Sequence, residues 1–414
     1  MHAWNKLLTL IQNPITIGIL LKMNRKINMM QSILKGAALA SLLALAGCAG
    51  TLKAPSANVY AADHFVSHTS TLPSLKGQPV GLFVRQKASA SLMQGGGDMT
   101  GRVVLFVHGA TVPSVPDFDL DHKSYNWMEY LARAGFNTYS VDLSGYGGSP
   151  RPMMDDPCNV DPKQQNLIIG KPLTGTCSAN HPQQFNTIRD DWADMDAVVE
   201  HLRRLNKVDR IHIIGWSAGG PRVGGYVAQH PAKIDRVMLY APSPVIKGPI
   251  PDKPAAGFPM QLQTRDDMER LRWNPDVRCP GQVEPGVRDA VWKSIMQWDR
   301  IGDSWGKAGT MRGRVATNFG WTQELSQKVT SPTLVVVGEF DRLVERRTVY
   351  EQIASQEKVF LDVACASHFM VWEKQHKVLH ESSLEWLRDG HVKGVKRGEF
   401  RVDYDGKYLP VVAK

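Results

Sequence analysis

Several features that mark large classes of proteins are absent from this sequence. Only five cysteines occur among 414 residues, with no Cys-x-x-Cys pair and no Cys/His cluster at zinc spacing, so we expect no structural metal. The chain has no P-loop and no Gly-x-Gly-x-x-Gly motif after a first strand, so we expect no cofactor. No block of Lys or Arg persists beyond residue 47, which argues against a nucleic-acid partner.

Acidic residues are absent from residues 1–47, which hold five basic residues. The rest of the chain has 44 basic and 40 acidic residues, so this segment supplies much of the formal net charge of +9. From Met23 onward, a basic stretch precedes about a dozen small and apolar residues, which are too few to span a bilayer comfortably and are typical of an export signal. Residues 1–22 add an apolar stretch ahead of it, so we expect translation to start at Met23, or at Met29 or Met30.

The export signal ends in Leu45-Ala46-Gly47-Cys48, which resembles the lipobox of bacterial lipoproteins. The resemblance implies that residues 1–47 are a leader, that Cys48 is lipidated after cleavage, and that the protein is anchored to a membrane of the cell envelope. Ala49 follows the cysteine where aspartate would suggest inner-membrane retention, which favours the outer membrane, facing the periplasm or the outside. An ordinary signal peptide with a chance cysteine is the alternative. Residues 48–75, rich in Ala, Ser and Thr, are expected to form a tether.

Four cysteines remain after the lipobox: Cys158, Cys177, Cys279 and Cys365. Export makes disulfides possible, and Cys158 and Cys177 flank one segment rich in Pro, Asn and Gly. We therefore expect a bridge between these two, with four free thiols as the alternative.

Short apolar runs alternate with amphipathic helical patterns along most of the chain. Strands are expected at 80–86, 102–109, 137–141, 210–217, 236–243, 333–341 and 358–368, with helices at 124–135, 187–205, 218–230, 346–355 and 376–388. Strand–helix alternation with right-handed crossovers predicts an α/β fold with a doubly wound, mostly parallel sheet and helices on both faces.

Two segments interrupt this alternation. Residues 148–186 form a long loop pattern rich in Pro, Asn and Gln. Residues 244–331 have the length of a lid or cap and contain Trp273, Trp292, Trp298, Trp305 and Trp321. In the C-terminal extension, alternation and the Asp405-Gly406 turn signal predict a hairpin. The expected division is a core at 76–243 and 332–390, a helical cap insertion at 244–331 and an extension at 391–414.

The stretch IHIIGWSAGG (211–220) places Ser217 between Gly215 and Gly219, after an apolar strand and before a helix. A sharp strand-to-helix turn would present the serine at its tip, and a side chain at either glycine position would collide with backbone. The start of the helix would offer the N–H of Ala218 to a developing negative charge. A serine hydroxyl is a poor nucleophile by itself, so this one needs a base and a group that orients the base.

Further motifs supply these partners. VLFVHGAT (104–111) resembles a His-Gly oxyanion loop, VDLSGYGGSPRP (141–152) an Asp-x-Arg-Gly-x-Gly-x-Ser turn, VVVGEFD (335–341) the segment that carries the acid, and ACASHFMVWE (364–373) the loop that carries the base. With the serine turn, they make the chain resemble the α/β-hydrolase superfamily, in its capped, esterase- or lipase-like form, over about residues 78–390.

The resemblance assigns a role to each of these positions. It implies the triad acid at Asp341, the base at His368 and a second oxyanion N–H at Ala110, beside that of Ala218. The chain order Ser, Asp, His is the order of this superfamily. Ser144 stands where arginine is common, so an ion pair frequent in the family is expected to be missing.

Other residues compete for these roles. Glu339 is an alternative acid, two residues before the favoured one. We expect His108 to bond loop backbone and His212 to pack inside a strand. His376 and His380 stand at i, i+4 on the last helix with no third ligand, so we expect a solvated helix face there rather than a metal site.

The resemblance implies a serine hydrolase that cleaves a carboxylic ester through an acyl-enzyme intermediate. Tryptophan and methionine in the cap favour a small apolar or aromatic ester as substrate, unless these residues only form the core of the cap. A peptidase of the proline-iminopeptidase type, with Asp266, Asp267 or Glu269 binding a free amine, is an alternative. A perhydrolase side activity and a non-catalytic, lipid-anchored binding protein also remain open.

Overall fold

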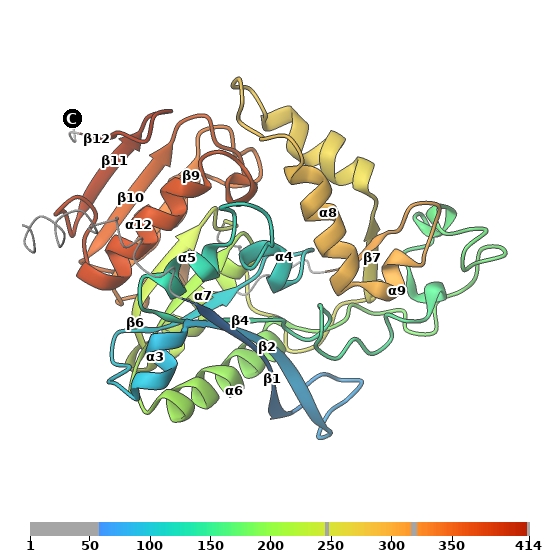
Figure 1. Cartoon of the computed structure of the whole chain (residues 1–414). Coiled ribbons are helices and arrows are strands. Elements are labelled where there is room, and N and C mark those ends of the chain that lie inside the picture. The colour runs from blue at the N-terminus through green and yellow to red at the C-terminus, as the bar shows by residue number, and fades with distance from the viewer. Residues whose placement is uncertain (1–57, 245–247, 316–320, 412–414) are drawn as a thin grey trace, which may run out of the picture. The chain divides into compact units, whose positions relative to one another are not determined.

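The computed structural model describes residues 58–244, 248–315 and 321–411. The expected leader, Cys48 and the first part of the expected tether lie outside the described residues. Within the described part, ten strands form one sheet in the order β1-β2-β4-β3-β5-β6-β9-β10-β11-β12 (Figure 1). Their bounds are β1 Val59–Thr69, β2 Pro79–Ser89, β3 Val103–Val107, β4 Asn137–Val141, β5 Ile211–Trp216, β6 Ile234–Tyr240, β9 Thr333–Gly338, β10 Lys358–Val363, β11 Gly398–Val402 and β12 Tyr408–Pro410.

The centre of the sheet is parallel. Neighbours from β4 through β11 all pair in parallel, whereas β1–β2, β2–β4 and β11–β12 pair antiparallel. Every residue of β3, β4, β5 and β9 is buried, as expected for strands covered on both faces. The predicted doubly wound, mostly parallel α/β sheet is confirmed.

Helices cover both faces of the sheet: α3 Ala90–Gly95, α4 Ser114–Phe118, α5 Trp127–Arg133, α6 Ile188–Asn206, α7 Gly219–Gln229, α11 Thr348–Gln352 and α12 His376–Asp389. Along β3, Val104 and Phe106 join an apolar core with residues of α5 and α12. Leu105 and Val107 join a second core with residues of α6, α7 and α11. Because successive side chains of β3 point to opposite faces of the sheet, each face packs against its own layer of helices. None of the helices in the described part is both long and apolar enough to span a bilayer.

The cap contains strands as well as helices. Its elements are β7 Met260–Gln263, the π-helix η4 Asp267–Trp273, the 3-10 turn η5 Asn274–Asp276, α8 Val287–Trp298, α9 Arg300–Asp303 and β8 Met311–Arg314, with β7 and β8 paired antiparallel. The insertion expected to be helical is therefore mixed. Trp321 and Leu325, the latter on α10 (Gln323–Ser326), join the sheet core beside α7, so the end of the expected cap belongs to the core.

The long loop at 148–186 packs with the cap. Its two short turns, η1 Pro157–Asn159 and η2 Gln165–Leu167, contribute to a third apolar cluster that also includes Met260, Leu262 and Trp305 of the cap. Val160 forms a parallel bridge with Met260. The two interruptions in the alternation therefore build one structure beside the sheet.

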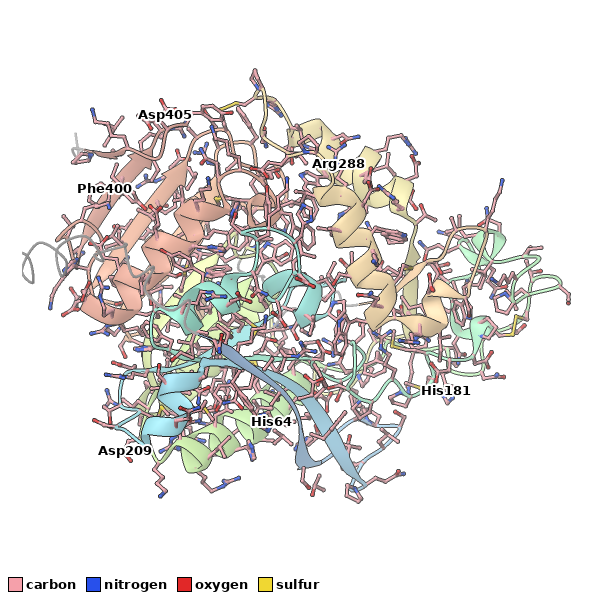
Figure 2. All side chains as sticks on the ribbon, viewed as in Figure 1. His64, His181, Asp209, Arg288, Phe400 and Asp405 are labelled. Atoms are coloured by element: carbon pink, nitrogen blue, oxygen red, sulfur yellow. A yellow bond between two sulfur atoms is a disulfide. The ribbon has the colours of Figure 1, made fainter. Side chains whose placement is uncertain are left out.

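Both ends of the described chain extend the sheet. The expected tether is wrong for residues 59–69, which form β1 along the full length of β2. Val66 is buried and His64 Nε2 lies 2.7 Å from Gln86 Oε1, so one face of β1 packs on the fold, whereas Asp63, Phe65 and Ser67 on the other face are exposed. At the other edge, β11 joins β10 in parallel and turns into β12 at Asp405-Gly406, so the extension continues the sheet; Figure 2 labels Phe400 on β11 and Asp405 in this turn.

Candidate active site

Ser217 lies at the turn between β5 and α7. Its φ of 56° is left-handed, a conformation that costs a residue with a side chain on the order of 1–3 kcal/mol. A Cβ at Gly215 would stand 2.5 Å from the carbonyl oxygen of Gly219, and one at Gly219 would stand 2.3 Å from that of Val107. Both positions therefore require glycine, and the turn holds the serine in its strained conformation.

Two hydrogen bonds connect Ser217 to His368 and Asp341. The Oγ of Ser217 lies 2.9 Å from His368 Nε2, and His368 Nδ1 lies 2.9 Å from Asp341 Oδ2. Because a carboxylate only accepts, Nδ1 carries the proton and Nε2 is free to accept from the serine hydroxyl. The structure thus brings the three expected triad residues into one chain of contacts.

The surroundings fix the histidine and the carboxylate. The carbonyl oxygen of His368 accepts bonds from Trp216 Nε1 at 3.1 Å and from the Tyr240 hydroxyl at 2.7 Å. Asp341 follows β9, and its other oxygen accepts the N–H of Leu343 at 2.8 Å. His368 and Asp341 are both buried, so these bonds hold them away from bulk water.

Backbone amides face the serine from two sides. Ala218 directly follows the serine at the start of α7, and Ala110 lines the same cavity. Among the hydrogen bonds of the described residues, neither amide has an acceptor. The carbonyl oxygen of Ala110 instead accepts from the Tyr146 hydroxyl, so the loop is turned with its N–H available.

A buried charge cluster supports this loop. Arg222 of α7 donates to the carbonyl oxygen of Gly109 at 3.1 Å and pairs with Asp191 of α6 at 2.8 Å. Arg314 of β8 also pairs with Asp191, at 2.6 Å. Burial acts to raise the pKa of Asp191, but the two guanidinium groups outweigh it and hold that pKa below its ordinary value.

The sequence did not reveal this cluster. The missing arginine at Ser144 suggested a lost ion pair, whereas the structure supplies guanidinium groups from a later helix and from the cap. The backbone N–H of Ser144 donates to Asp194 at 2.9 Å. Arg222 and Arg314 lie more than 70 positions from Ser144 along the chain, so no local pattern marks them.

The cavity at Ser217 is small and covered by the cap. Its volume is about 30 Å³, enough for one or two water molecules. Gln263 of β7 and Met268 and Arg272 of η4 cover it from the cap. The other lining residues are Gly109, Ala110, Thr111, Val112, Trp216, Ser217, His368 and Phe369.

None of the five cap tryptophans lines this cavity. Trp273 packs on Phe369 and Trp372, with ring centroids 5.4 and 5.7 Å away, in the core above the sheet. Trp305 belongs to the cluster shared with the 148–186 loop, and Trp321 packs beside α7. The expected aromatic lining of the site is therefore wrong for these residues. The alternative, that they form apolar cores, holds for Trp273, Trp292, Trp305 and Trp321, whereas Trp298 packs on Phe83 outside these clusters.

Glu373 ties the cap to the loop that carries His368. Its buried carboxylate accepts from Trp273 Nε1 at 2.8 Å, from Gln282 Nε2 at 3.1 Å and from the N–H of Ser367 at 2.9 Å. Burial raises the pKa of Glu373. Because Ser367 directly precedes His368, one side chain positions both walls of the cavity.

Two disulfides occur in the described chain. Cys158 is bonded to Cys177 inside the 148–186 loop, which is the pair the sequence suggested. Cys279 is bonded to Cys365 across 86 positions, a pairing the sequence did not indicate. The second bond joins the cap covalently to the chain three residues before His368.

The competing residues occupy other places. Glu339 accepts the N–H of Cys365 at 3.0 Å and pairs with Arg401 at 2.6 Å, so it does not face His368. His108 Nδ1 bonds the carbonyl oxygen of Gly109 at 2.8 Å, and its Nε2 accepts the N–H of Leu143, so it bonds loop backbone as expected. His212 is buried and bonds the carbonyl oxygen of Gly101.

The histidines of the last helix are also buried, so the expected solvated face is wrong. The ring of His376 lies 4.0 Å from that of Tyr125, and the ring of His380 lies 4.9 Å from that of Tyr130. Burial lowers the pKa of His376 to about 4. The described residues contain no group of three or more His, Cys, Asp or Glu side chains placed to hold a metal ion.

The acidic residues considered for amine binding do not reach the cavity. Asp266 pairs with Arg270 at 2.8 Å, and Glu269 pairs with Arg265 at 2.6 Å. Asp267 accepts from Thr264 at 2.7 Å. Their charges are satisfied within the cap.

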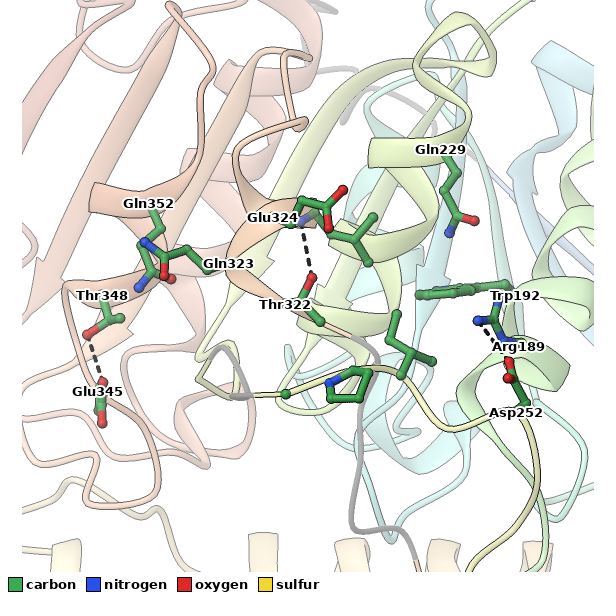
Figure 3. Close-up of a pocket in the computed structure, with 14 residues that line it drawn as sticks. Arg189, Trp192, Gln229, Asp252, Thr322, Gln323, Glu324, Glu345, Thr348 and Gln352 are labelled. Atoms are coloured by element: carbon green, nitrogen blue, oxygen red, sulfur yellow. Dashed lines mark hydrogen bonds and ion pairs between the residues drawn. The ribbon is translucent and has the colours of Figure 1, made fainter.

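A larger cavity lies away from the triad. It measures about 1060 Å³ and is lined by residues of α6, α7, α10 and α11, among them Trp192, Gln229, Glu324 and Gln352 (Figure 3). None of the triad residues lines it. It therefore has no part in chemistry at Ser217.

Comparisons with known proteins identify the family of the chain. The chain is 27% identical over 284 residues to the AB hydrolase superfamily protein YisY of Bacillus subtilis (strain 168), covering 67% of this chain and 89% of the relative. Its fold is similar to a thermophilic esterase from Thermogutta terrifontis (17% identity, TM-score 0.46, 79% of this chain and 99% of that one). It is also similar to naproxen esterase from Bacillus subtilis (12% identity, TM-score 0.46, 80% and 92%). Residues 104–381 match the Alpha/beta hydrolase family, and the chain belongs to that family.

Proposed function

We propose that this protein is a serine hydrolase that cleaves a carboxylic ester through an acyl-enzyme intermediate. The observation that carries the proposal is the pair of 2.9 Å contacts that connects Ser217, His368 and Asp341. A serine hydroxyl within hydrogen-bond distance of an imidazole, which is itself oriented by a buried carboxylate, is the arrangement that nucleophilic acyl transfer needs.

The reaction follows from these contacts. His368 Nε2 takes the hydroxyl proton as Ser217 Oγ attacks the ester carbonyl, and the carboxylate of Asp341 stabilises the imidazolium that forms. The same nitrogen then gives its proton to the leaving alcohol. Water, activated by His368, attacks the acyl-enzyme and releases the acid.

The negative charge that develops on the carbonyl oxygen needs donors. Ala110 lines the cavity and Ala218 directly follows Ser217, and neither N–H has another acceptor in the described part of the chain. A single donor of this kind contributes about 2.7–4 kcal/mol to the transition state. Because Arg222 and Tyr146 hold the carbonyl oxygens of the Ala110 loop, the donors are in place before the substrate arrives.

A fluorophosphonate probe tests the nucleophile directly. The full chain should be labelled at Ser217 by peptide mass mapping, and S217A should not be labelled. H368A should react at least about 100-fold more slowly, the range for loss of a general base. E339Q is the matched control, because Glu339 lies two residues from Asp341 but pairs with Arg401.

Absence of labelling in a folded, wild-type chain would overturn this function. The non-catalytic binding protein would then be the better explanation. Labelling at Ser217 with hydrolysis of amides only would instead favour the peptidase.

We also propose that the protein is exported and anchored to the cell envelope through lipidated Cys48. Two disulfides among the described residues support an oxidising compartment. Mass spectrometry of the N-terminal peptide isolated from bacterial membranes checks this. A diacylated Cys48 is expected, and C48S should leave the protein soluble in the periplasm.

A further inference from the structure

Arg272 lies at the wall of the catalytic cavity. It stands near the end of the π-helix η4, next to buried Trp273, and lines the same cavity of about 30 Å³ as Ser217 and His368. The segment is fixed by the bond from Trp273 Nε1 to Glu373. The residue next to Arg272 is thus connected to Glu373, which follows His368 by five positions.

The neighbouring arginines are paired, whereas Arg272 is not. Arg265 pairs with Glu269 and Asp289, and Arg270 pairs with Asp266. No hydrogen bond or ion pair joins the Arg272 side chain to any residue in the described ranges. Burial alone lowers its pKa, with no carboxylate nearby to compensate.

The rest of the cavity lining also supplies no anion that could pair with Arg272. Its lining contains no Asp or Glu, and the polar side chains beside the triad residues are those of Thr111 and Gln263. A guanidinium that is partly removed from water without an anion is costly, and the cost disappears when a ligand supplies the anion. The planar guanidinium fits a carboxylate with two parallel hydrogen bonds.

We propose that Arg272 binds a carboxylate of the substrate, so that the esters cleaved here carry a negative charge close to the scissile bond. This inference rests on the proposed ester hydrolysis at Ser217. The substrate class is the monoester of a short dicarboxylic acid, or an ester with a carboxylate at a similar distance. It also disfavours substrates with a free amine, because Arg272 would repel their charge.

Two methyl esters with the same five-carbon acyl chain provide the test: monomethyl glutarate, whose chain ends in a carboxylate, and methyl pentanoate, whose chain ends in a methyl group. Wild-type full chain should prefer the acidic ester in kcat/KM. In R272Q the ratio of the two kcat/KM values should fall by roughly 10- to 100-fold, the range for a hydrogen bond to a charged group, with most of the change in KM. R272K should retain part of the preference, because it keeps the charge and loses the paired geometry.

R270Q is the matched control. It removes the same charge from the same helix, but Arg270 is exposed and paired with Asp266. The ratio should be unchanged in R270Q. If Arg272 only stabilised the end of the helix, R272Q would lower the melting temperature and leave the ratio as in the wild type.

The two proposals fail in different ways. Hydrolysis of methyl pentanoate that depends on Ser217, with no preference for the acidic ester and no change of ratio in R272Q, would overturn the role of Arg272 and leave ester hydrolysis standing. If neither ester is hydrolysed, calorimetry with glutarate still decides on Arg272. Binding to the wild type that weakens at least about tenfold in R272Q would support it, and no binding to the wild type would refute it.

Discussion

At the scale of single residues, the strained backbone of Ser217 depends on the absence of side chains at Gly215 and Gly219. The left-handed backbone is held because Gly215 and Gly219 allow the strand, the turn and the start of α7 to approach each other within van der Waals contact. The contacts that a Cβ would meet are backbone atoms, which cannot rotate away. Serine is therefore presented to His368 by close backbone packing rather than by its own conformational preference.

Replacing Gly219 tests this packing. In G219A the new Cβ would be 2.3 Å from the carbonyl oxygen of Val107, so β3 and α7 must separate. We expect a loss of about 1–3 kcal/mol in the free energy of unfolding and a much larger fractional loss of kcat/KM. G97A is the control, because a Cβ there meets nothing within 4 Å and should change neither quantity measurably. Denaturant titration and esterase assays give the two quantities.

Asp194 makes the stability depend on pH. It is buried, its Oδ2 accepts the N–H of Ser144, and His68 Nε2 lies 3.4 Å from its Oδ1. Burial raises the pKa of Asp194 to about 7. The folded state therefore retains a proton that the unfolded chain releases near pH 4, so this residue's contribution to stability is present at low pH and is lost as the pH rises towards 7.

The variant D194N removes that dependence. The wild type should lose stability from pH 5 to pH 8, whereas D194N should not. The free energy of unfolding of D194N minus that of the wild type should therefore be about 2–4 kcal/mol larger at pH 8 than at pH 5. Denaturant titrations at the two pH values measure it. A difference between the two proteins that does not change with pH would mean that Asp194 is ionised in the fold throughout. The same titrations of H68Q show how much the imidazole of His68 contributes to the pH dependence of stability.

At the scale of elements, the cap is fixed to the loop of His368 by two independent links. One is the carboxylate of Glu373, which bonds Trp273 and Gln282 of the cap and also Ser367. The other is the disulfide between Cys279 and Cys365. With both in place, η4 cannot move far from the cavity without also moving His368.

Removal of each disulfide should therefore have a different effect. The Cys279–Cys365 bond closes a loop of 86 positions and the Cys158–Cys177 bond one of 19, so the chain-entropy contributions are about 4–5 and about 3 kcal/mol. We expect the double variant C279S/C365S to lose more stability and also to lose kcat/KM, because Arg272 and His368 become less well aligned. C158S/C177S should lose stability with a smaller effect on kcat/KM. Equal kinetic effects in the two variants would show that the cap link does not position the site.

At the scale of the whole molecule, short sequence patterns predicted the features that depend on residues close together in the chain. Continuous apolar runs gave the parallel strands, and the motifs around Ser217, Asp341 and His368 gave residues that the structure places in contact. β1 was missed because alanine and polar residues make up most of this edge strand, so its composition is that of a linker. The burial of His376 depends on Tyr125, more than 250 positions away, and no short window of sequence contains that contact.

The link between the cap and the sheet also joins residues that are far apart in the sequence. Arg314, on β8 of the cap, is buried against Asp191 of α6, and Asp191 also pairs with Arg222, which holds the carbonyl oxygen of Gly109. Docking of the cap is thus connected to the loop that presents the N–H of Ala110. A Cβ at Gly145 would be 2.4 Å from Arg314 Cδ, so the absence of a side chain at Gly145 makes room for the side chain of Arg314.

A double-mutant cycle measures this link. R314M leaves Asp191 with one guanidinium in place of two, and removal of one partner from a buried charge pair costs about 3–5 kcal/mol. D191N alone leaves two buried cations without their anion and should cost at least as much. In R314M/D191N the costs should be less than additive by about 1–3 kcal/mol, the range for contacting residues. Additive costs would show that Arg314 and Asp191 act independently. An unchanged kcat/KM in R314M would show that docking of the cap does not affect the Gly109–Ala110 loop.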